Sequence, residues 1–353
     1  MPKKIVVCCD GTWNTAGQQR NGKPRSTNVD KIKDMIPPAV DSNGVTQRVF
    51  YQPGVGTKPW ELLSGGAFGY GLSQNVVKAY EFLVSTYEPG DQLFLFGFSR
   101  GAFTARSLAG LVRKSGILRP AERGRVKEAF QLYRDKQKPT DPGPTRFRAQ
   151  HSHEEFRIRF VGVWDTVGAL GIPILGPRWL KPVWQQVNKR WSFHDTKLST
   201  QVDGAFQALA IDEQRSVFEP TLWNQQPDAV GQVLEQAWFA GHHCAVGGGL
   251  TDAALPDTAL LWMAERAEKL GLEFEPGALG GLRPNLMAGF GESRSGVYKL
   301  TRALHRPIGE ASTDGRMDGA ESVWSSATER YRRNADYRPP ELVKYLKRHA
   351  TVP

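Results

Sequence analysis

The segment 92–112 contains the feature that most constrains the fold. The apolar run QLFLFGF is followed at once by Ser99, which stands between Gly97 and Gly101. Such a run is typical of a strand that is buried on both faces of a parallel sheet. Residues 100–112 have the pattern of a helix. We therefore predict a strand, a tight turn and a helix in succession, with Ser99 on the turn.

Further apolar runs alternate with helical patterns along the chain. Expected strands are 5–9, 48–51, 92–98, 157–164 and 237–240, and expected helices are 71–87, 100–112 and 257–270. This alternation is the signature of a parallel sheet with helices on both faces. We therefore expect an α/β protein, α/β-hydrolase-like, with a mostly parallel central sheet and a single domain over residues 1–353.

A Trp- and Pro-rich stretch interrupts the alternation. Residues 171–191 carry three prolines and three tryptophans, so we predict an inserted cap at residues 170–225. Tryptophan tolerates a setting that is partly apolar and partly wet. Trp179 and Trp184 are therefore candidates for binding an acyl chain or touching a bilayer. The alternative is a cap that simply packs over the core.

Composition and charge exclude several classes of protein. Lys and Arg exceed Asp and Glu by 46 to 36, a net charge of +10, which suits peripheral contact with an anionic membrane surface or solubility alone. No RNA-binding signature or zinc-finger spacing accompanies the charge, so we expect no nucleic-acid partner. Three cysteines cannot form a disulfide framework. Without a signal-peptide pattern or an apolar span of membrane length, we expect a cytoplasmic protein as made, whose export would need a signal-independent secretion system.

The position of Ser99 suggests chemistry. A serine on a strained strand–helix turn projects its hydroxyl from the carboxyl edge of the sheet. The backbone N–H of Arg100 would lie at the amino end of the helix, where it can bind an oxyanion. Ser99 is thus a candidate nucleophile, and the alternative is a small residue that merely fits a tight turn.

A serine nucleophile needs a base and an acid that orients the base. Asp165 follows the apolar run in RFVGVWDTVG, and His242 and His243 follow another in WFAGHHCAVGGG. The order Ser, Asp, His is the order of α/β hydrolases, and Asp212 is a reserve candidate for the acid. A metal site at the histidine pair is disfavoured, because adjacent side chains of an extended segment point to opposite faces. We expect no metal and no other cofactor.

The loop DGTWN follows the first expected strand. A backbone N–H of Gly11, Thr12 or Trp13 could supply a second oxyanion donor. Equally, Asp10 could cap the turn that follows it. A strand that ends in Asp also resembles the start of a haloacid-dehalogenase-type phosphohydrolase, whose nucleophile is aspartate. That motif has a second acid two residues later, where this chain has Thr12.

Six ordered motifs resemble one family. CCDGTWNT, YQPGVGT, GFSRGAFTAR, GVWDTV, ALAIDEQR and WFAGHHCAVGGG are similar to motifs of the uncharacterised α/β-hydrolase-domain family that includes the type VI secretion phospholipase effectors. The resemblance runs from about Lys3 to Leu270. It implies an α/β-hydrolase core, a Ser-Asp-His triad and hydrolysis of lipid or phospholipid esters. Residue by residue, it implies Ser99 as nucleophile, Asp165 as acid and His243, rather than His242, as base.

The chain departs from that family at two points. Relatives usually read close to GxHSDVGGG at the last motif, and Ala245 stands here in place of the aspartate. The chain also lacks the long extra regions of the large effectors, so their membrane docking is not carried over. Three hypotheses remain: a serine esterase or lipase, a non-catalytic binding protein that keeps the fold, and a phosphohydrolase whose nucleophile is an aspartate. The acyl chain, the headgroup and the oligomeric state stay open.

Overall fold

The structure is a computed structural model of the chain. It describes residues 2–11, 19–20, 23–37, 40, 42, 44–54, 65–167, 197–294, 298–299, 303–309 and 320–349. Thr12, Trp13, Trp179 and Trp184, which the sequence singles out, lie outside the described residues.

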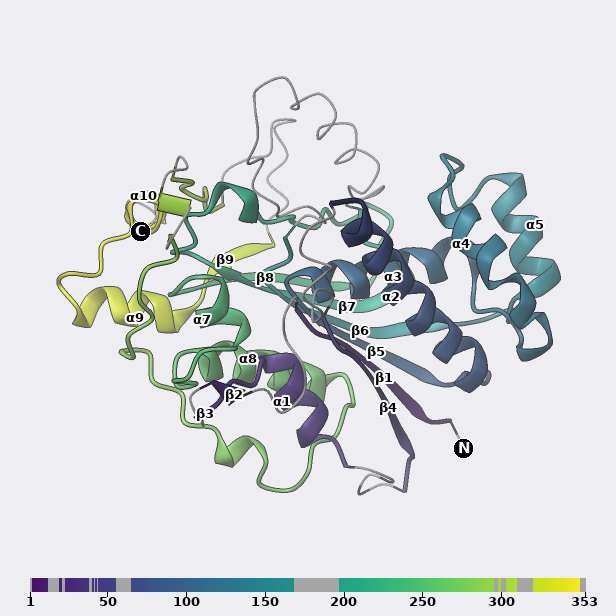
Figure 1. Cartoon of the computed structure of the whole chain (residues 1–353), viewed down its shortest axis with the longest axis horizontal. Helices are drawn as coiled ribbons and strands as arrows, with labels where there is room; N and C mark the ends of the chain where they lie inside the picture. Colours follow the sequence, from purple (N-terminus) through teal and green to yellow (C-terminus); the bar gives the residue numbers. More distant parts are fainter. Residues whose placement is uncertain are drawn as a thin grey trace.

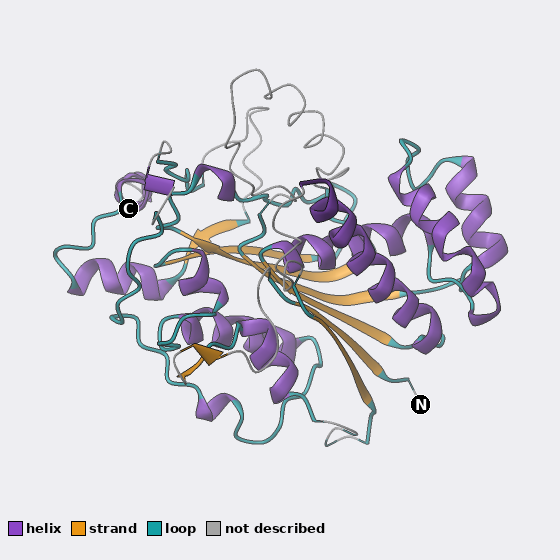
Figure 2. Cartoon of the chain, viewed as in Figure 1, coloured by secondary structure: helices purple, strands orange, loops and turns teal. Residues whose placement is uncertain are grey.

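A seven-stranded parallel sheet forms the centre of the molecule (Figures 1 and 2). In spatial order its strands are β4 (Gln47–Gln52), β1 (Lys4–Cys9), β5 (Gln92–Phe98), β6 (Arg157–Trp164), β7 (Val202–Ala210), β8 (Val233–Phe239) and β9 (Glu321–Val323). Each neighbouring pair is parallel. All the carboxyl ends therefore meet at one edge, which is the edge where α/β proteins bind ligands. A small ribbon, β2 (Gln19–Arg20) and β3 (Lys23–Pro24), stands apart from this sheet.

Helices cover both faces of the sheet (Figure 1). The described helices are α1 (Asn28–Met35), α2 (Gly65–Thr86), α3 (Arg100–Ser115), α4 (Val126–Arg134), α5 (Pro142–His151), α7 (His243–Gly247), α8 (Pro256–Lys269), α9 (Ser325–Arg333) and α10 (Pro340–His349), with short 3₁₀ turns at Pro120–Arg125, Ser216–Phe218 and Leu279–Gly281. Helices α2 to α5 pack on one face, and α1 and α8 pack on the other. In the described part of the chain, no helix has both the length and the apolar character to cross a membrane.

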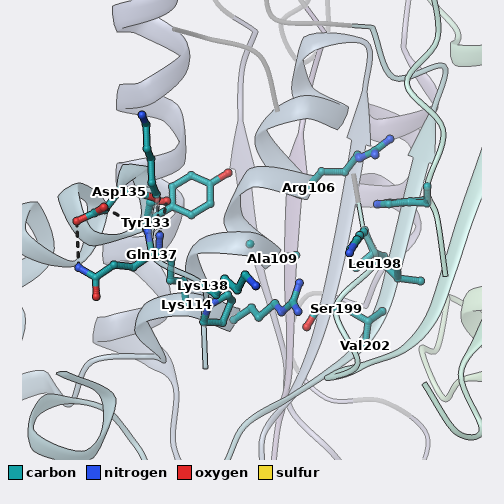
Figure 3. A pocket seen from close by; sticks show the side chains of 17 residues that line it. Arg106, Ala109, Lys114, Tyr133, Asp135, Gln137, Lys138, Leu198, Ser199 and Val202 are labelled. Carbon is teal, nitrogen blue, oxygen red and sulfur yellow. Dashed lines mark hydrogen bonds between the residues drawn. The ribbon is translucent and has the colours of Figure 1, made fainter. Parts of the chain in front are cut away.

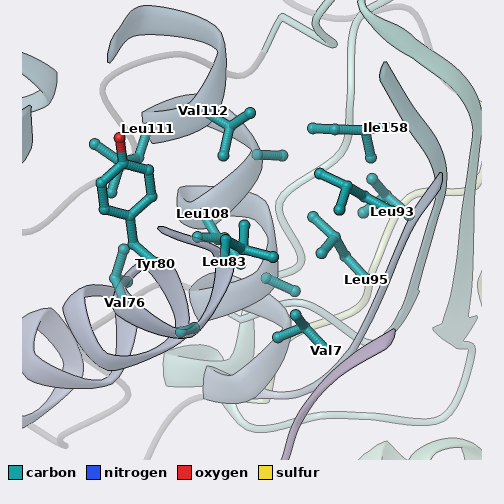
Figure 4. Packing of buried hydrophobic residues seen from close by; sticks show 14 of the residues in the cluster. Val7, Val76, Tyr80, Leu83, Leu93, Leu95, Leu108, Leu111, Val112 and Ile158 are labelled. Carbon is teal, nitrogen blue, oxygen red and sulfur yellow. The ribbon is translucent and has the colours of Figure 1, made fainter. Parts of the chain in front are cut away.

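Alternate residues of the central strands β1, β5 and β6 enter two separate cores. Val7 of β1 and Leu95 of β5 contact the side of α2 and α3, where Leu83 and Leu108 pack against them (Figure 4). Their sequence neighbours, such as Phe94 in β5, enter the core on the opposite face. Both faces of these strands are thus buried, which explains why they read as nearly continuous apolar runs. The predicted α/β fold with a parallel central sheet is confirmed.

The predicted cap is wrong over part of its span. Residues 168–196 lie outside the described residues, but residues 202–210 form β7, which pairs with β6 and β8 inside the central sheet. This strand, VDGAFQALA, is rich in small residues and carries Gln207 at its centre. It lacks the β-branched run by which a buried strand is usually recognised, so the sequence concealed it.

Candidate active site

The turn between β5 and α3 holds Ser99 in a strained conformation. Its backbone has φ 57° and ψ −118°, a region that a non-glycine residue enters only when its surroundings enforce it. Two close approaches do so here. A Cβ on Gly97 would lie 2.5 Å from the carbonyl oxygen of Gly101, and a Cβ on Gly101 would lie 2.0 Å from that of Cys9. Both glycines are therefore required for the start of α3 to pack against the ends of β1 and β5.

Asp165 lies at the end of the neighbouring strand, β6. It has φ 43° and, with Ser99, is one of two non-glycine residues with positive φ in the described part of the chain. Its carboxylate is fully buried, and its Oδ1 accepts the backbone N–H of Ala210 at 3.0 Å. The main chain joins the two strand ends, since the N–H of Ser99 donates to the carbonyl of Trp164 at 3.0 Å.

His243 begins the short helix α7, after the end of β8. Its Nδ1 lies 2.6 Å from Oδ2 of Asp165. The imidazole is buried between the rings of Phe98 and Phe218, whose centroids lie 4.6 and 4.8 Å away. Phe98 is the residue before Ser99, so the ends of β5, β6 and β8 converge here. The structure thus joins Asp165 directly to His243, and Ser99, at the end of β5, lies on the same carboxyl edge of the sheet.

Arg306 is a site residue that the sequence did not reveal. Its guanidinium donates to both oxygens of Asp165, at 2.6 Å from Nη1 and 3.1 Å from Nη2. It also donates to the main-chain carbonyls of Ala210 and Phe218. The side chain is fully buried. Its partner lies 141 residues earlier in the chain, and no local pattern around Leu304–Ile308 marks the contact.

The buried charges set the protonation of the pair. Burial alone would raise the pKa of Asp165, but the Arg306 guanidinium and the His243 hydrogen bond outweigh it and hold that pKa well below its usual range. Burial also lowers the pKa of His243, although the Asp165 carboxylate opposes this shift. At neutral pH Asp165 is therefore ionised and His243 neutral. An ionised carboxylate can only accept a hydrogen bond, so Nδ1 carries the proton and Nε2 is the basic nitrogen.

A second buried carboxylate supports the backbone of the histidine. Oε2 of Glu213 accepts the N–H of His243 at 3.3 Å, and the Arg215 guanidinium pairs with Glu213 at 2.8 Å. Burial raises the pKa of Glu213, but its hydrogen bond with Arg215 and the charge of Arg215 outweigh this and leave the pKa lowered. The motif ALAIDEQR drew attention to Asp212, whereas the residue after it is the one that contacts His243.

Asp212 and His242 have other partners. Oδ2 of Asp212 accepts the N–H of Gly241 at 2.6 Å and the hydroxyl of Tyr337 at 2.8 Å. His242 is the N-cap of α7: its Nδ1 accepts the N–H of Cys244 at 3.2 Å, and its Nε2 lies 2.7 Å from the carbonyl oxygen of Phe290. Both residues therefore organise the turn that carries His243.

Asp10 accepts hydrogen bonds from three groups. Its Oδ2 accepts the hydroxyls of Tyr51 at 2.7 Å and Thr27 at 2.8 Å, and its Oδ1 accepts the N–H of Gly11 at 2.6 Å. Burial raises the pKa of Asp10 to about 6. The Gly11 N–H is thus engaged by a carboxylate, and the other two loop donors, Thr12 and Trp13, lie outside the described residues.

Ala245 occupies an apolar position. It is buried in a small cluster with Leu255 and Ala288, and a Cβ on Gly241 would lie only 2.5 Å from its own Cβ. In this chain the carboxylates that hold His243 are Asp165 and Glu213. The absence of an aspartate at position 245 therefore does not leave the histidine unsupported.

The fold and the comparisons define the protein class together. The all-parallel sheet with helices on both faces is an α/β fold. The chain belongs to the family described as T6SS, Phospholipase effector Tle1-like, catalytic domain, whose profile matches residues 3–266.

Individual relatives are distant. The chain is 28% identical over 249 residues to the uncharacterized protein YEL023C of Saccharomyces cerevisiae, a match that covers 64% of this chain and 33% of that protein. An uncharacterized protein from Pseudomonas aeruginosa is 18% identical, with a TM-score of 0.49, over 79% of this chain and 47% of that one. The Tle1 effector solved bound to the VgrG spike of the type 6 secretion system is 19% identical, with a TM-score of 0.38, over 70% of this chain and 51% of that one. The chain thus spans about a third to a half of the length of these relatives.

Proposed function

We propose that this protein is a serine esterase or lipase that hydrolyses acyl esters of lipids through an acyl-enzyme. The observation that carries the proposal is the buried Asp165–His243 pair, with its 2.6 Å hydrogen bond, beside a serine held on a strained strand–helix turn. Membership of a family of phospholipase effectors supports phospholipid esters as the substrate class.

Acylation would begin with attack of Ser99 Oγ on the ester carbonyl carbon. Nε2 of His243 takes the hydroxyl proton, and the imidazolium that forms is stabilised by Asp165. The lowered pKa of His243 suits this step, because the ring is neutral and able to accept a proton at pH 7. His243 then returns the proton to the leaving alcohol, and the acyl group remains on Ser99.

The negative charge of the tetrahedral intermediate needs preorganised donors. The N–H of Arg100, at the first turn of α3, is one donor in this proposal, and the helix dipole favours an anion there. The second comes from the loop after β1. Of its three candidates, Gly11 already donates to Asp10, so Thr12 or Trp13 is the better choice.

Deacylation repeats the chemistry with water as the nucleophile. Neutral His243 deprotonates the water, which attacks the acyl carbon, and Ser99 leaves with the proton that the imidazolium returns.

We extend the proposal to Trp179 and Trp184 as contacts of the acyl chain, and to the net charge of +10 as an attraction toward anionic phospholipid surfaces. Delivery by a secretion machine, as the Tle1–VgrG complex suggests for a relative, belongs to the same proposal.

The test compares hydrolysis by the full chain and two serine variants, with phosphatidylcholine vesicles and p-nitrophenyl butyrate as substrates. Ser99→Ala should lower kcat by at least about 10⁴-fold, because the nucleophile is lost. Ser85→Ala, which removes an exposed hydroxyl from α2, should retain wild-type activity. Release that is unchanged in Ser99→Ala, or absent from the folded wild type, would exclude a serine hydrolase.

A further inference from the structure

A cavity of about 340 Å³ lies on the flank of α3, apart from the triad (Figure 3). Its size falls at the lower end of the range of about 300–1,000 Å³ that is common for small-molecule sites. Val202, the first residue of β7, forms part of its wall, whereas the Asp165–His243 pair lies at the opposite, carboxyl edge of the sheet. None of the triad residues is among the described residues that line it.

The charge around this cavity is strongly one-sided. Tyr133 and Asp135 lie on one side of it, and Leu198, Ser199 and Val202 lie on the other (Figure 3). The described lining contains one acidic side chain, Asp135, and six basic ones: Arg106, Arg113, Lys114, Lys136, Lys138 and Lys197. Basic side chains from several separate segments thus converge on one space, which raises the local concentration of anions.

Two of these cations are buried against neutral acceptors. Lys114 is 5% exposed, and its Nζ donates to the main-chain carbonyl of Asp135 at 2.6 Å. In the described part of the chain, no carboxylate oxygen lies within ion-pair distance of this Nζ. Arg106, 6% exposed, donates to Oε1 of Gln207 at 3.2 Å and to the carbonyl of Leu222 at 3.3 Å.

Buried cations lose hydration, and main-chain dipoles replace only part of it. Accordingly, burial lowers the pKa of Lys114 and lowers that of Arg106 to about 9. An anion in the cavity would give the buried Lys114 ammonium a counter-charge. Several Lys and Arg donors in one space suit a dianionic phosphate group better than a single carboxylate.

The rest of the lining is apolar. Ala109, Val161, Leu198, Val202 and Trp223 contribute to it, and the Arg106 guanidinium stacks on the Trp223 ring at 4.3 Å. We propose that this cavity binds a phosphate monoester that carries a short apolar group, with the phosphate toward Lys114 and Lys138 and the apolar group toward Val202 and Trp223. This site is independent of the proposed esterase chemistry.

Calorimetric titration of the full-length Ser99→Ala protein tests the proposal without turnover at the triad. Hexyl phosphate should bind at least about tenfold more tightly than inorganic phosphate, hexanoate or neutral hexyl glucoside. The double variant Lys136→Gln/Lys138→Gln should weaken hexyl phosphate binding by about tenfold or more. Both lysines are exposed, so their replacement does not threaten the fold.

A matched double variant, Arg123→Gln/Lys127→Gln, removes the same charge from exposed positions outside the cavity and should leave the affinity unchanged. Lys114→Met, checked for folding by circular dichroism, should reduce the affinity for hexyl phosphate further than Lys136→Gln/Lys138→Gln does. The proposal is overturned if hexyl phosphate does not bind or if the two double variants bind it alike. It is also overturned if hexanoate or inorganic phosphate binds as tightly as hexyl phosphate.

Discussion

At the scale of single residues, the candidate site is built from conformations and charges that need support from elsewhere. Ser99 and Asp165 both have positive φ, a strain of about 1–3 kcal/mol each. In return, both side chains project from adjacent strand ends at one edge of the sheet. The buried hydrogen bonds of Asp165 to Ala210, His243 and Arg306 hold its carboxylate in this position.

The contact between Arg306 and Asp165 predicts a shift in the pH dependence of catalysis. In Arg306→Met the carboxylate loses two charge-assisted hydrogen bonds, so the aspartate charge acts on His243 without a counter-charge and raises the histidine pKa. We expect kcat/KM to fall by about 10–100-fold, and its acid limb to move to higher pH. Arg306→Lys should recover part of the lost kcat/KM and should move the acid limb part of the way back toward its wild-type pH. The measurement is the pH profile of kcat/KM with a soluble ester.

Arg330→Met is the control for that experiment. Arg330 is also buried in the C-terminal region, but it donates to the main-chain carbonyls of Leu286 and Ala288. Its replacement should destabilise the fold without moving the acid limb. An acid limb at the same pH in Arg306→Met and the wild type would show that Arg306 does not act on the pair.

Acid stability follows from the same ion pair. The pKa of Asp165 is lowered in the folded state, so its stabilisation is present above the unfolded pKa of about 3.9 and is lost as the pH falls toward the folded value. Leaving Asp165 buried without Arg306 should cost about 3–5 kcal/mol. In urea titrations, Arg306→Met should also begin acid unfolding at a higher pH than the wild type does.

The sequence reveals the site residues that follow apolar runs and conceals the others. Ser99 and Asp165 come directly after runs that form β5 and β6, and His243 follows the end of β8 by four residues, so their position at one edge follows from parallel topology. Arg306 and Glu213 act through contacts between distant segments. Those contacts exist only after the chain folds, and neither the residue types nor their spacing in the sequence predicts them.

At the scale of elements, strands with large apolar residues were predictable and β7 was not. β7 pairs with β6 on one side and with β8 on the other. Large side chains from neighbouring elements pack against its small residues. A Cβ at Gly204 would lie 2.5 Å from Leu270. Tertiary packing therefore determined a strand that local propensity disfavours.

The strand–turn–helix unit also makes a testable prediction. Gly101→Ala places a Cβ 2.0 Å from the Cys9 carbonyl oxygen, so α3 must move away from β1 or the turn must distort. We expect a loss of about 1–3 kcal/mol in the free energy of unfolding, together with lower reactivity of Ser99. Gly124→Ala, where nothing lies within 4 Å of the added atom, should stay within about 0.5 kcal/mol of the wild type. Equal stability of the two variants in urea unfolding would refute the close approach.

At the scale of the whole molecule, the structure extends beyond the family match. The matched region ends at residue 266, yet the later segments provide β9, α9, α10 and Arg306. Ile308, Ala327 and Leu342 from these segments form a core with Leu209 and Trp238 of the central sheet. The C-terminal region thus packs against the central sheet in a third hydrophobic cluster and contributes Arg306 to the candidate site.

A shortened chain tests this integration. A chain that ends at residue 294 loses the cover over Leu209 and Trp238 as well as the Asp165 counter-charge, so we expect aggregation or a cooperative unfolding transition at much lower temperature. A chain that ends at residue 349 should behave like the full chain. Thermal unfolding followed by circular dichroism makes the comparison, and wild-type stability of the chain ending at 294 would contradict it.

The central claim is that Ser99 is a nucleophile activated by His243. The most direct measurement is labelling with a fluorophosphonate, followed by mass spectrometry of the peptides, on the wild type, Ser99→Ala, His243→Ala and His242→Asn. The account predicts an adduct on Ser99 that disappears in Ser99→Ala, is lost or greatly slowed in His243→Ala and remains in His242→Asn, where an N-cap side chain is kept. A folded wild type that takes no label, or a label that is unaffected by His243→Ala, would contradict it.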